Sequence, residues 1–174
     1  MQADAASAYH SILIGKESAK ATTVWLPYRS RTQLFEHTRA VMGCVNSGTA
    51  MTTRYNEAIS NDMPARARAM LASLADDFVG FCKTVADLVY VVRCFFAMCA
   101  KNRITLKASK VRIGYPSVEF YGMKYDKSGV RPTERNLSPV RQLQVPQSRK
   151  ELQSILGLFQ FFAHFICDSV ADVK

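Results

Sequence analysis

Apolar positions along the chain follow two spacings, which predict different elements. Over 85–99 they recur at three- and four-residue steps, the spacing of one face of an α-helix. The run 47–59 has a similar helical spacing, and we expect this second helix to end within 61–64. β-Branched and aromatic residues at 22–26 instead predict a strand that ends at Pro27.

Other segments have shorter patterns. Residues 9–14 fit either a helix or a strand, and 31–42 is typical of an extended chain. Short strands are expected over 104–110 and 117–126, followed by a turn at 127–132. Together these segments predict a mixture of helices and short strands.

The C-terminal part has the features of a helix start. Ser148 and Glu151 form a capping-box pattern, in which the serine side chain accepts a hydrogen bond from the backbone of the first turn. The apolar residues of 152–166 follow, and their side chains need another element to pack against. We therefore predict a C-terminal helix.

The stretch "MLASLADDFVGF" (residues 70–81) places Asp76 and Asp77 between two apolar runs. This arrangement predicts a β-hairpin with both carboxylates near its turn. Aspartate is common in turns for backbone reasons alone. However, adjacent carboxylates repel each other unless a cation offsets their charge, and Mg²⁺ prefers oxygen ligands.

A third carboxylate near the hairpin would favour the cation site over the simple turn. Asp4 is a candidate because it stands just before the apolar segment "AASAYHSILI". Taken alone, this position also suits a helix N-cap.

Composition indicates a globular protein of one domain, or of one domain with a small appendage. The chain has 174 residues, of which 48% are hydrophobic. Its five cysteines include no CxxC pair, which favours a reducing compartment. No secretory signal opens the chain, and the apolar stretch 85–100 is too short and too charged to span a membrane. We expect an intracellular protein, cytoplasmic or nuclear, that is not secreted.

Positive charge is concentrated in one segment. Residues 101–150 contain 12 Lys or Arg against three acidic residues, which equals the formal net charge of +9 for the whole chain. Such a segment attracts polyanions, and nucleic acid is the usual one. A solvated basic surface that aids solubility is the alternative explanation.

Five motifs in order resemble the reverse transcriptase of gypsy-type LTR retrotransposons, from Asp4 to about Ile166. They are "DAASAYHSILI", "MGCVNSGTAMTTRYNEAI", "LADDFVGFCKT", "RITLKASKVRIGYPSVEFYGMKYDKSGVRP" and "SRKELQSILGLFQFFAHFI". The resemblance implies an α+β fold: a polymerase palm-like antiparallel sheet with packed helices, followed by a small helical connection segment. It implies a palm over 1–130 and a connection or thumb-like segment over 131–174.

The resemblance also implies roles for individual residues. The catalytic and metal-binding positions are Asp4, Asp76 and Asp77, which match the family's first aspartate and the pair of its Tyr-x-Asp-Asp box. Nucleotide-binding positions are Tyr9, Asn46, Ser47, Gly48 and Lys110. Primer-binding positions are Leu74, Phe120, Tyr121 and Gly122.

Structural explanations stand beside several of these roles. Tyr9 suits a core tyrosine, and 46–48 suits a helix cap. Lys110 suits a solvated surface, and the aromatic residues 120–121 suit packing within a strand. Leu74 departs from the family, which has an aromatic residue there, and the change removes a ring contact with the primer end.

The implied function is RNA-directed DNA synthesis, with two Mg²⁺ or Mn²⁺ ions as cofactors and a primed RNA or DNA template and deoxynucleoside triphosphates as partners. Because only three residues precede Asp4, we expect a palm without its fingers, which belongs to a longer polyprotein with ribonuclease H and has little activity alone. The alternative function is a non-catalytic nucleic-acid-binding or assembly protein that retains the palm fold. Binding that is indifferent to Mg²⁺ would favour that alternative.

Overall fold

The computed structural model describes residues 1–165, and the chain forms two compact units. The first is residues 1–115, and the second begins at Pro116. The boundary expected at 130/131 lies within strand β8 (Gly129–Pro132). Strand β8 pairs with β7 (Met123–Asp126).

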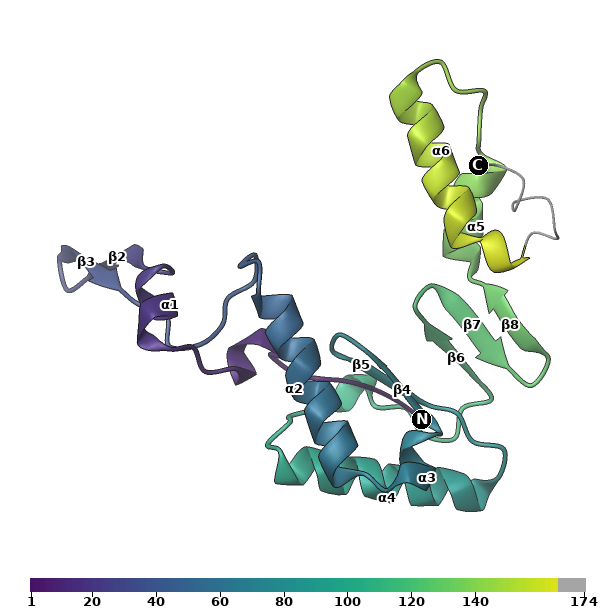
Figure 1. Ribbon diagram of the computed structural model, residues 1–174, viewed down its shortest axis with the longest axis horizontal. Coiled ribbons are helices and arrows are strands. Elements are labelled where there is room, and N and C mark those ends of the chain that lie inside the picture. Colours follow the sequence, from purple (N-terminus) through teal and green to yellow (C-terminus); the bar gives the residue numbers. More distant parts are fainter. Residues whose placement is uncertain (166–174) are drawn as a thin grey trace. The chain divides into compact units, whose positions relative to one another are not determined.

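The first unit is built on an antiparallel sheet. Its strands are β1 (Gln2–Asp4), β5 (Asp77–Gly80) and β4 (Leu71–Leu74), with β5 in the middle (Figure 1). Strands β4 and β5 form the predicted hairpin, joined by a turn at 75–76. The antiparallel sheet that the family resemblance implied is therefore confirmed.

Helices α2 (Ser47–Asp62) and α4 (Val85–Lys101) confirm the two predicted helices and pack on this sheet (Figure 1). The short helix α3 (Ala65–Arg68) lies between them in the chain. Phe78 of β5 is fully buried, and its ring centroid lies 5.4 Å from that of Tyr55 of α2 and 5.1 Å from that of Phe95 of α4. These three rings come from one strand and two helices, and they meet at the centre of the core.

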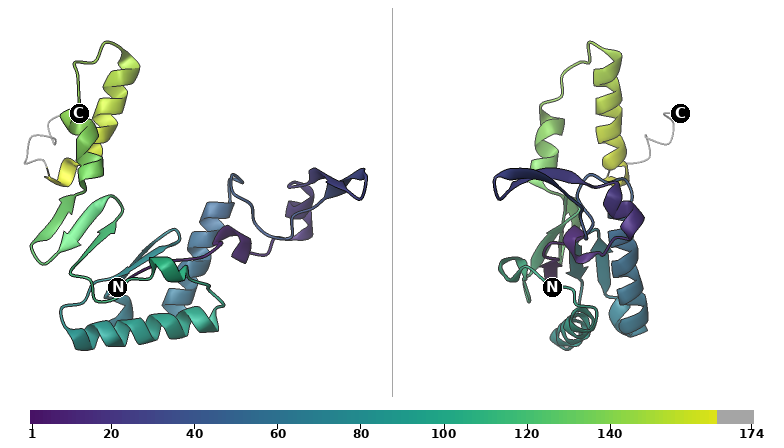
Figure 2. Two further views of the ribbon diagram at one scale, coloured as in Figure 1. Left: turned by 180° about the vertical axis from the view of Figure 1, so that it is seen from behind. Right: turned by 90° about the vertical axis from the view of Figure 1, so that its left-hand side faces the viewer.

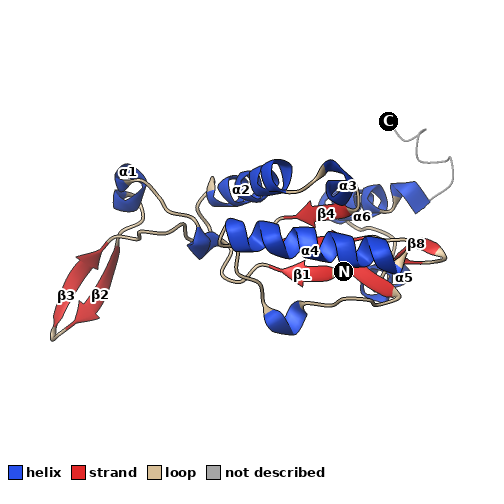
Figure 3. Cartoon of the chain, turned by 90° about the horizontal axis from the view of Figure 1, so that it is seen from below, coloured by secondary structure: helices blue, strands red, loops and turns tan. Residues whose placement is uncertain are grey.

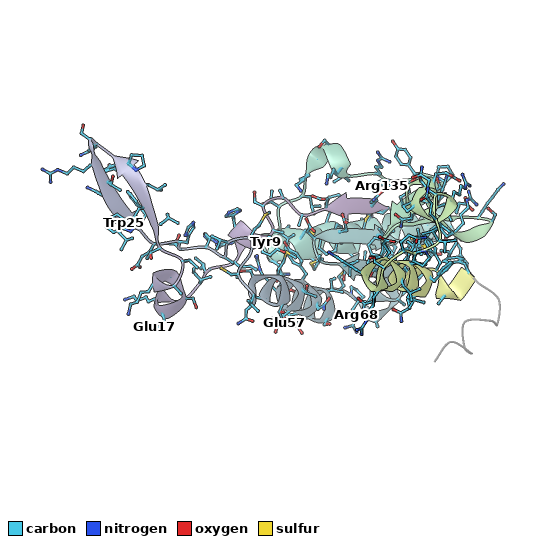
Figure 4. All side chains as sticks on the ribbon, turned by 90° about the horizontal axis from the view of Figure 1, so that it is seen from above. Tyr9, Glu17, Trp25, Glu57, Arg68 and Arg135 are labelled. Carbon is cyan, nitrogen blue, oxygen red and sulfur yellow. The ribbon has the colours of Figure 1, made fainter. Side chains whose placement is uncertain are left out.

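A second hairpin contains β2 (Val24–Tyr28) and β3 (Arg31–Phe35), which form a sheet of their own (Figure 3). The prediction that the strand ends at Pro27 was wrong, since β2 continues through it. In a ladder of two strands each strand is an edge, and an edge tolerates the missing N–H of proline. The Trp25 side chain is 68% exposed on this hairpin (Figure 4).

The other short elements of this unit are a helix and two 3₁₀ turns. Residues 9–14, which fitted either a helix or a strand, contain the 3₁₀ turn η1 (Tyr9–Ser11), and α1 (Lys16–Lys20) follows. The strand expected over 104–110 was wrong. That segment makes one isolated bridge, from Leu106 to Ala5, and then the 3₁₀ turn η2 (Ala108–Lys110).

The second unit begins with an antiparallel sheet of β6 (Ser117–Phe120), β7 and β8, in chain order. The strands expected within 117–126 are confirmed. The segment 127–132 was predicted as a turn, but only its first part is one, and the rest is β8.

Two helices complete the described part of the second unit, α5 (Glu134–Arg141) and α6 (Arg149–Phe161) (Figure 2). The predicted cap of α6 is confirmed, because the Glu151 backbone N–H donates to the Ser148 hydroxyl at 3.2 Å. The helix ends earlier than expected, and the 3₁₀ turn η3 (Ala163–Phe165) follows. The last predicted helical residue, Ile166, lies outside the described residues.

Within residues 1–165 no helix has both the length and the apolar character required to cross a membrane. The cysteines at 44, 82, 94 and 99 are free thiols. Cys99 is buried, and desolvation raises the pKa of its thiol to about 12. Cys167 lies outside the described residues.

Candidate active site

One row of side chains crosses the sheet of the first unit at the end where β4 turns into β5. Asp4 lies opposite Asp77, and Asp77 lies opposite Leu74. Directly opposite residues of antiparallel strands project from the same face, so these three side chains are neighbours. Phe78, one position further along β5, points to the opposite face and into the core.

Asp76 stands in the turn beside this row. The turn is tied to β1, because the Ala5 backbone N–H donates to the Asp76 carbonyl oxygen at 2.8 Å. Ala75, the other turn residue, has a φ of 53°, a left-handed conformation that non-glycine residues seldom adopt. The structure therefore brings Asp4, Asp76 and Asp77 to one end of the sheet, although Asp4 is far from the others in the sequence.

Two lysines contact Asp4, whose side chain is only 8% exposed. Lys110 Nζ donates to Oδ2 at 2.7 Å, and Lys107 Nζ forms an ion pair with Oδ1. Oδ1 is buried, and the Lys107 ammonium group is its ion-pair partner. Both cations are much more exposed than the carboxylate that they contact, at 41% for Lys107 and 57% for Lys110.

The charges of this site shift its pKa values in opposite directions. Burial by itself would raise the pKa of Asp4, but the contacts with Lys107 and Lys110 outweigh it and hold the pKa below its ordinary value. Burial, and then the charges of Asp76 and Asp4, raise the pKa of Asp77. The hydrogen bond and the charge of Asp4 raise the pKa of Lys110. The aspartates thus form a site with unfavourable negative charge, which the lysines offset only in part.

The residues present suit a divalent cation, although they are not arranged around one. Among the described residues, no group of three acidic, histidine or cysteine side chains has the geometry of a metal site. The repulsion that the charges of Asp76 and Asp4 impose on Asp77 is nevertheless what a cation would relieve. Carboxylate oxygens are also the ligands that Mg²⁺ prefers. The chemistry of the three carboxylates, but not their present arrangement, therefore suits a divalent cation.

The predicted nucleotide-binding residues of the N-terminal segment lie close to the start of α2. A Cβ atom on Gly48 would be 3.9 Å from the Tyr9 hydroxyl oxygen, so the two positions are neighbours. Ser47 is buried in the first turn of α2, and Asn46 is the exposed N-cap residue. The Asn46 side chain makes no capping hydrogen bond, and therefore capping does not explain its presence.

The predicted primer-binding residues belong to both units. Leu74 lies in the acidic row and is 45% exposed. Phe120, Tyr121 and Gly122 belong to the second unit, where the last two form the turn from β6 to β7 with φ values of 50° and 71°. The turn packs within its own unit, because Asn136 Nδ2 donates to the Gly122 carbonyl oxygen at 3.1 Å and the Tyr121 ring lies 6.0 Å from that of Phe161.

Lys107 is the member of this site that the sequence-based reasoning missed. The basic segment contains many lysines, and Lys110 was selected because it matched a family motif. The three-residue step from Lys107 to Lys110 is a signal that was available, since such residues align on one side of a 3₁₀ turn.

The fold and this site define a polymerase palm: an antiparallel hairpin with an acidic turn, flanked by a strand that ends in a third aspartate. A family model described as reverse transcriptase (RNA-dependent DNA polymerase) matches residues 1–125, most of the chain. The chain therefore belongs to the reverse transcriptase family. Members of this family generally use divalent metal ions.

Solved structures of foamy viral reverse transcriptases are similar to this chain. A foamy viral protease-reverse transcriptase in complex with double-stranded DNA matches with a TM-score of 0.74 and 22% identity, over 92% of this chain and 27% of that one. The corresponding complex with an RNA/DNA hybrid matches with a TM-score of 0.68 and 22% identity, over 92% of this chain and 21% of that one. The native protease-reverse transcriptase of prototype foamy virus matches with a TM-score of 0.59 and 21% identity, over 98% of this chain and 22% of that one.

At these identities the likeness shows the shared fold. The chain spans about a quarter of the length of the foamy viral protein with the TM-score of 0.74. A comparison with curated proteins found no match.

Proposed function

We propose that this chain is the palm of an RNA-directed DNA polymerase from a gypsy-type LTR retrotransposon, which extends a primer with deoxynucleoside triphosphates. The observation that carries the proposal is the antiparallel register that puts Asp4 opposite Asp77, beside the turn residue Asp76. Family membership supports the reaction class, and the five ordered motifs support the gypsy-type origin.

In this proposal Asp4, Asp76 and Asp77 hold two Mg²⁺ or Mn²⁺ ions. When bound there, these ions would supply Lewis acidity for the primer 3′-hydroxyl and positive charge for the departing pyrophosphate. The buried Asp4 is the fixed ligand, because strand pairing on β1 and the surrounding core limit its movement. Asp76 is the adaptable ligand, because it belongs to the turn.

The remaining residues position substrates. Tyr9 and Gly48 are neighbours, so the Tyr9 ring would lie under the incoming sugar and restrict it sterically. Asn46 and Ser47 face the nucleotide at the start of α2, where a helix N-terminus favours phosphate. Lys110 would supply a proton to the leaving pyrophosphate. Leu74, Phe120, Tyr121 and Gly122 would contact the primer.

The wider context follows from the same proposal. The chain would act in the cytoplasm or nucleus, on an RNA or DNA template, together with fingers and ribonuclease H parts of a polyprotein. A chain that spans about a quarter of a foamy viral enzyme is expected to have weak activity by itself. The basic segment 101–150 would contribute the electrostatic part of template binding.

Primer extension tests the proposal. The full chain is incubated with a primed template, labelled nucleotide and Mg²⁺ or Mn²⁺, beside the variants Asp76→Asn and Asp62→Asn. Asp62 is the matched control, because it pairs with Lys101 at 2.5 Å, away from the acidic row. A metal ion held by the site contributes several kcal/mol, so Asp76→Asn should reduce incorporation by about 100-fold or more.

Two results would contradict this proposal. One is incorporation that is equal in the wild type and Asp76→Asn. The other is primer-template binding that depends on salt but not on divalent cations or on Asp4→Ala, in a chain that incorporates no nucleotide. That second result would support the non-catalytic binding protein, since counterion release alone accounts for it.

A further inference from the structure

The segment 105–112 runs along the outer edge of β1 and leaves it in the middle. At one end the Ala6 backbone N–H donates to the Thr105 carbonyl oxygen at 2.7 Å, and the Lys107 N–H donates to the Asp4 carbonyl oxygen at 2.9 Å. At the other end Gln2 and Arg112 exchange both backbone hydrogen bonds, at 2.7 and 2.8 Å. The chain between these anchors bulges out as η2.

This bulge aligns two lysines on one carboxylate. The Lys110 backbone N–H donates to the Lys107 carbonyl oxygen at 2.9 Å, and side chains three residues apart in a 3₁₀ turn eclipse one another. Each lysine takes a different oxygen of Asp4. The backbone of both partners therefore places the two lysines beside the Asp4 carboxylate.

The two sides of this contact differ in mobility. Asp4 is almost fully buried and cannot turn to water, whereas both lysines are about half exposed, so their ammonium groups can reach solvent when another cation takes their place. The buried charge of Asp4 needs a compensating cation in any state of the protein. The negative charges of Asp76 and Asp77 increase that need.

We propose that Lys107 and Lys110 act as the counter-cations of Asp4 in the metal-free protein, and that Lys107 sets the affinity of the aspartates for divalent cations. A metal ion that binds Asp4 must displace these ammonium groups or share the carboxylate with them. Lys107 is thus a positioning residue that keeps β1 folded without metal and weakens metal binding. This inference rests on the proposed function, because it takes Asp4, Asp76 and Asp77 as the metal ligands.

Metal titration tests the role of Lys107. Mn²⁺ alone is titrated into the full chain and the free ion is measured by electron paramagnetic resonance. A charged hydrogen bond or ion pair changes a binding constant by about tenfold. Because Lys107 competes with the metal for Asp4, Lys107→Gln should bind Mn²⁺ about tenfold more tightly than the wild type. Lys107→Arg, which keeps the charge, should bind like the wild type.

Lys101→Gln is the matched control. It makes the same substitution and removes a Lys–Asp pair of the same kind, that of Lys101 with Asp62, but at another place in the fold. Its Mn²⁺ affinity should equal that of the wild type. Thermal unfolding in EDTA and in Mn²⁺ gives a second measurement: Mn²⁺ should raise the Tm of Lys107→Gln more than that of Lys101→Gln.

The outcomes separate this inference from the proposed function. If Mn²⁺ binding is lost in Asp76→Asn but is no tighter in Lys107→Gln than in the wild type, the lysine role is wrong and the metal site stands. If no variant shows Mn²⁺ binding that depends on the aspartates, both are wrong. Should Lys107→Gln fail to fold, Lys107→Met, which keeps the apolar part of the side chain and removes the charge, takes its place, and unchanged Mn²⁺ affinity there would equally overturn the inference.

Discussion

Replacing Phe78 with alanine should remove most of the stability of the first unit, because this ring lies at the centre of its core. Relative to a methyl group, the fully buried ring takes roughly 100–130 Å² more apolar surface out of water, worth ~3 kcal/mol at ~25 cal/mol per Å². The contacts with the Tyr55 and Phe95 rings add about 1 kcal/mol beyond the area. We expect a loss of about 4 kcal/mol, within the range of about 3–5 kcal/mol typical of this change.

The assay is urea unfolding of the full chain, followed by far-UV circular dichroism, with Phe96→Ala as the matched control. Phe96 lies on α4 beside Phe95, but it is 38% exposed and its removal leaves no enclosed cavity. Its loss should therefore cost less than half as much. If Phe78→Ala costs no more than Phe96→Ala, the three-ring core described for this unit is wrong.

Three further predictions concern single positions. Asp77→Asn should stabilise the metal-free protein by about 0.5 kcal/mol at pH 7. The gain is small because Asp77 is only partly desolvated and solvent screens its repulsion. Since the folded-state pKa of Asp77 is raised, this gain should vanish as the pH falls below about 4, as measured by urea unfolding in EDTA. Gly122→Ala should lower the free energy of unfolding by about 1–3 kcal/mol, because Gly122 has a φ of 71° and the new Cβ would lie 2.0 Å from Asn136 Nδ2. Its control, Gly157→Ala, lies in open space within α6 and should raise the free energy of unfolding by about 0.5–1 kcal/mol. Equal shifts of the two Tm values would contradict this prediction. Iodoacetamide at pH 8 should label the exposed Cys44 in the native protein but label Cys99 only after unfolding, because burial raises the pKa of the Cys99 thiol to about 12. Peptide mass spectrometry follows the labelling, and prompt labelling of Cys99 in the native protein would contradict its burial.

The elements that were predictable from the sequence have strong local signals. The apolar stripe of α4 and the hairpin around Asp76 depend on spacing within a single segment. Helix α5 was not predicted, because Pro139 lies inside it and proline normally interrupts a helix. Strand β2 was placed too short for the same reason, as Pro27 is tolerated only because its strand is an edge.

The candidate site was predictable only in part, since its members are distant in the sequence. Spacing and composition left Asp4 as either an N-cap or a third ligand, and only the family resemblance favoured the second. The pairing of β1 with β5 depends on tertiary structure, which a local pattern does not contain. Lys107 escaped notice for a related reason: its importance comes from the bulge at the edge of β1, and its sequence context differs little from that of the other lysines.

The alternation along β5 links chemistry to folding. Asp77 and Phe78 are adjacent and point to opposite faces, so a slip of one residue in strand pairing would bury an acid in the aromatic core and expose the ring to water. Misregistered chains would then be unstable as well as unable to assemble the acidic row. A chain that has folded with Phe78 in the core has therefore also placed Asp4 opposite Asp77.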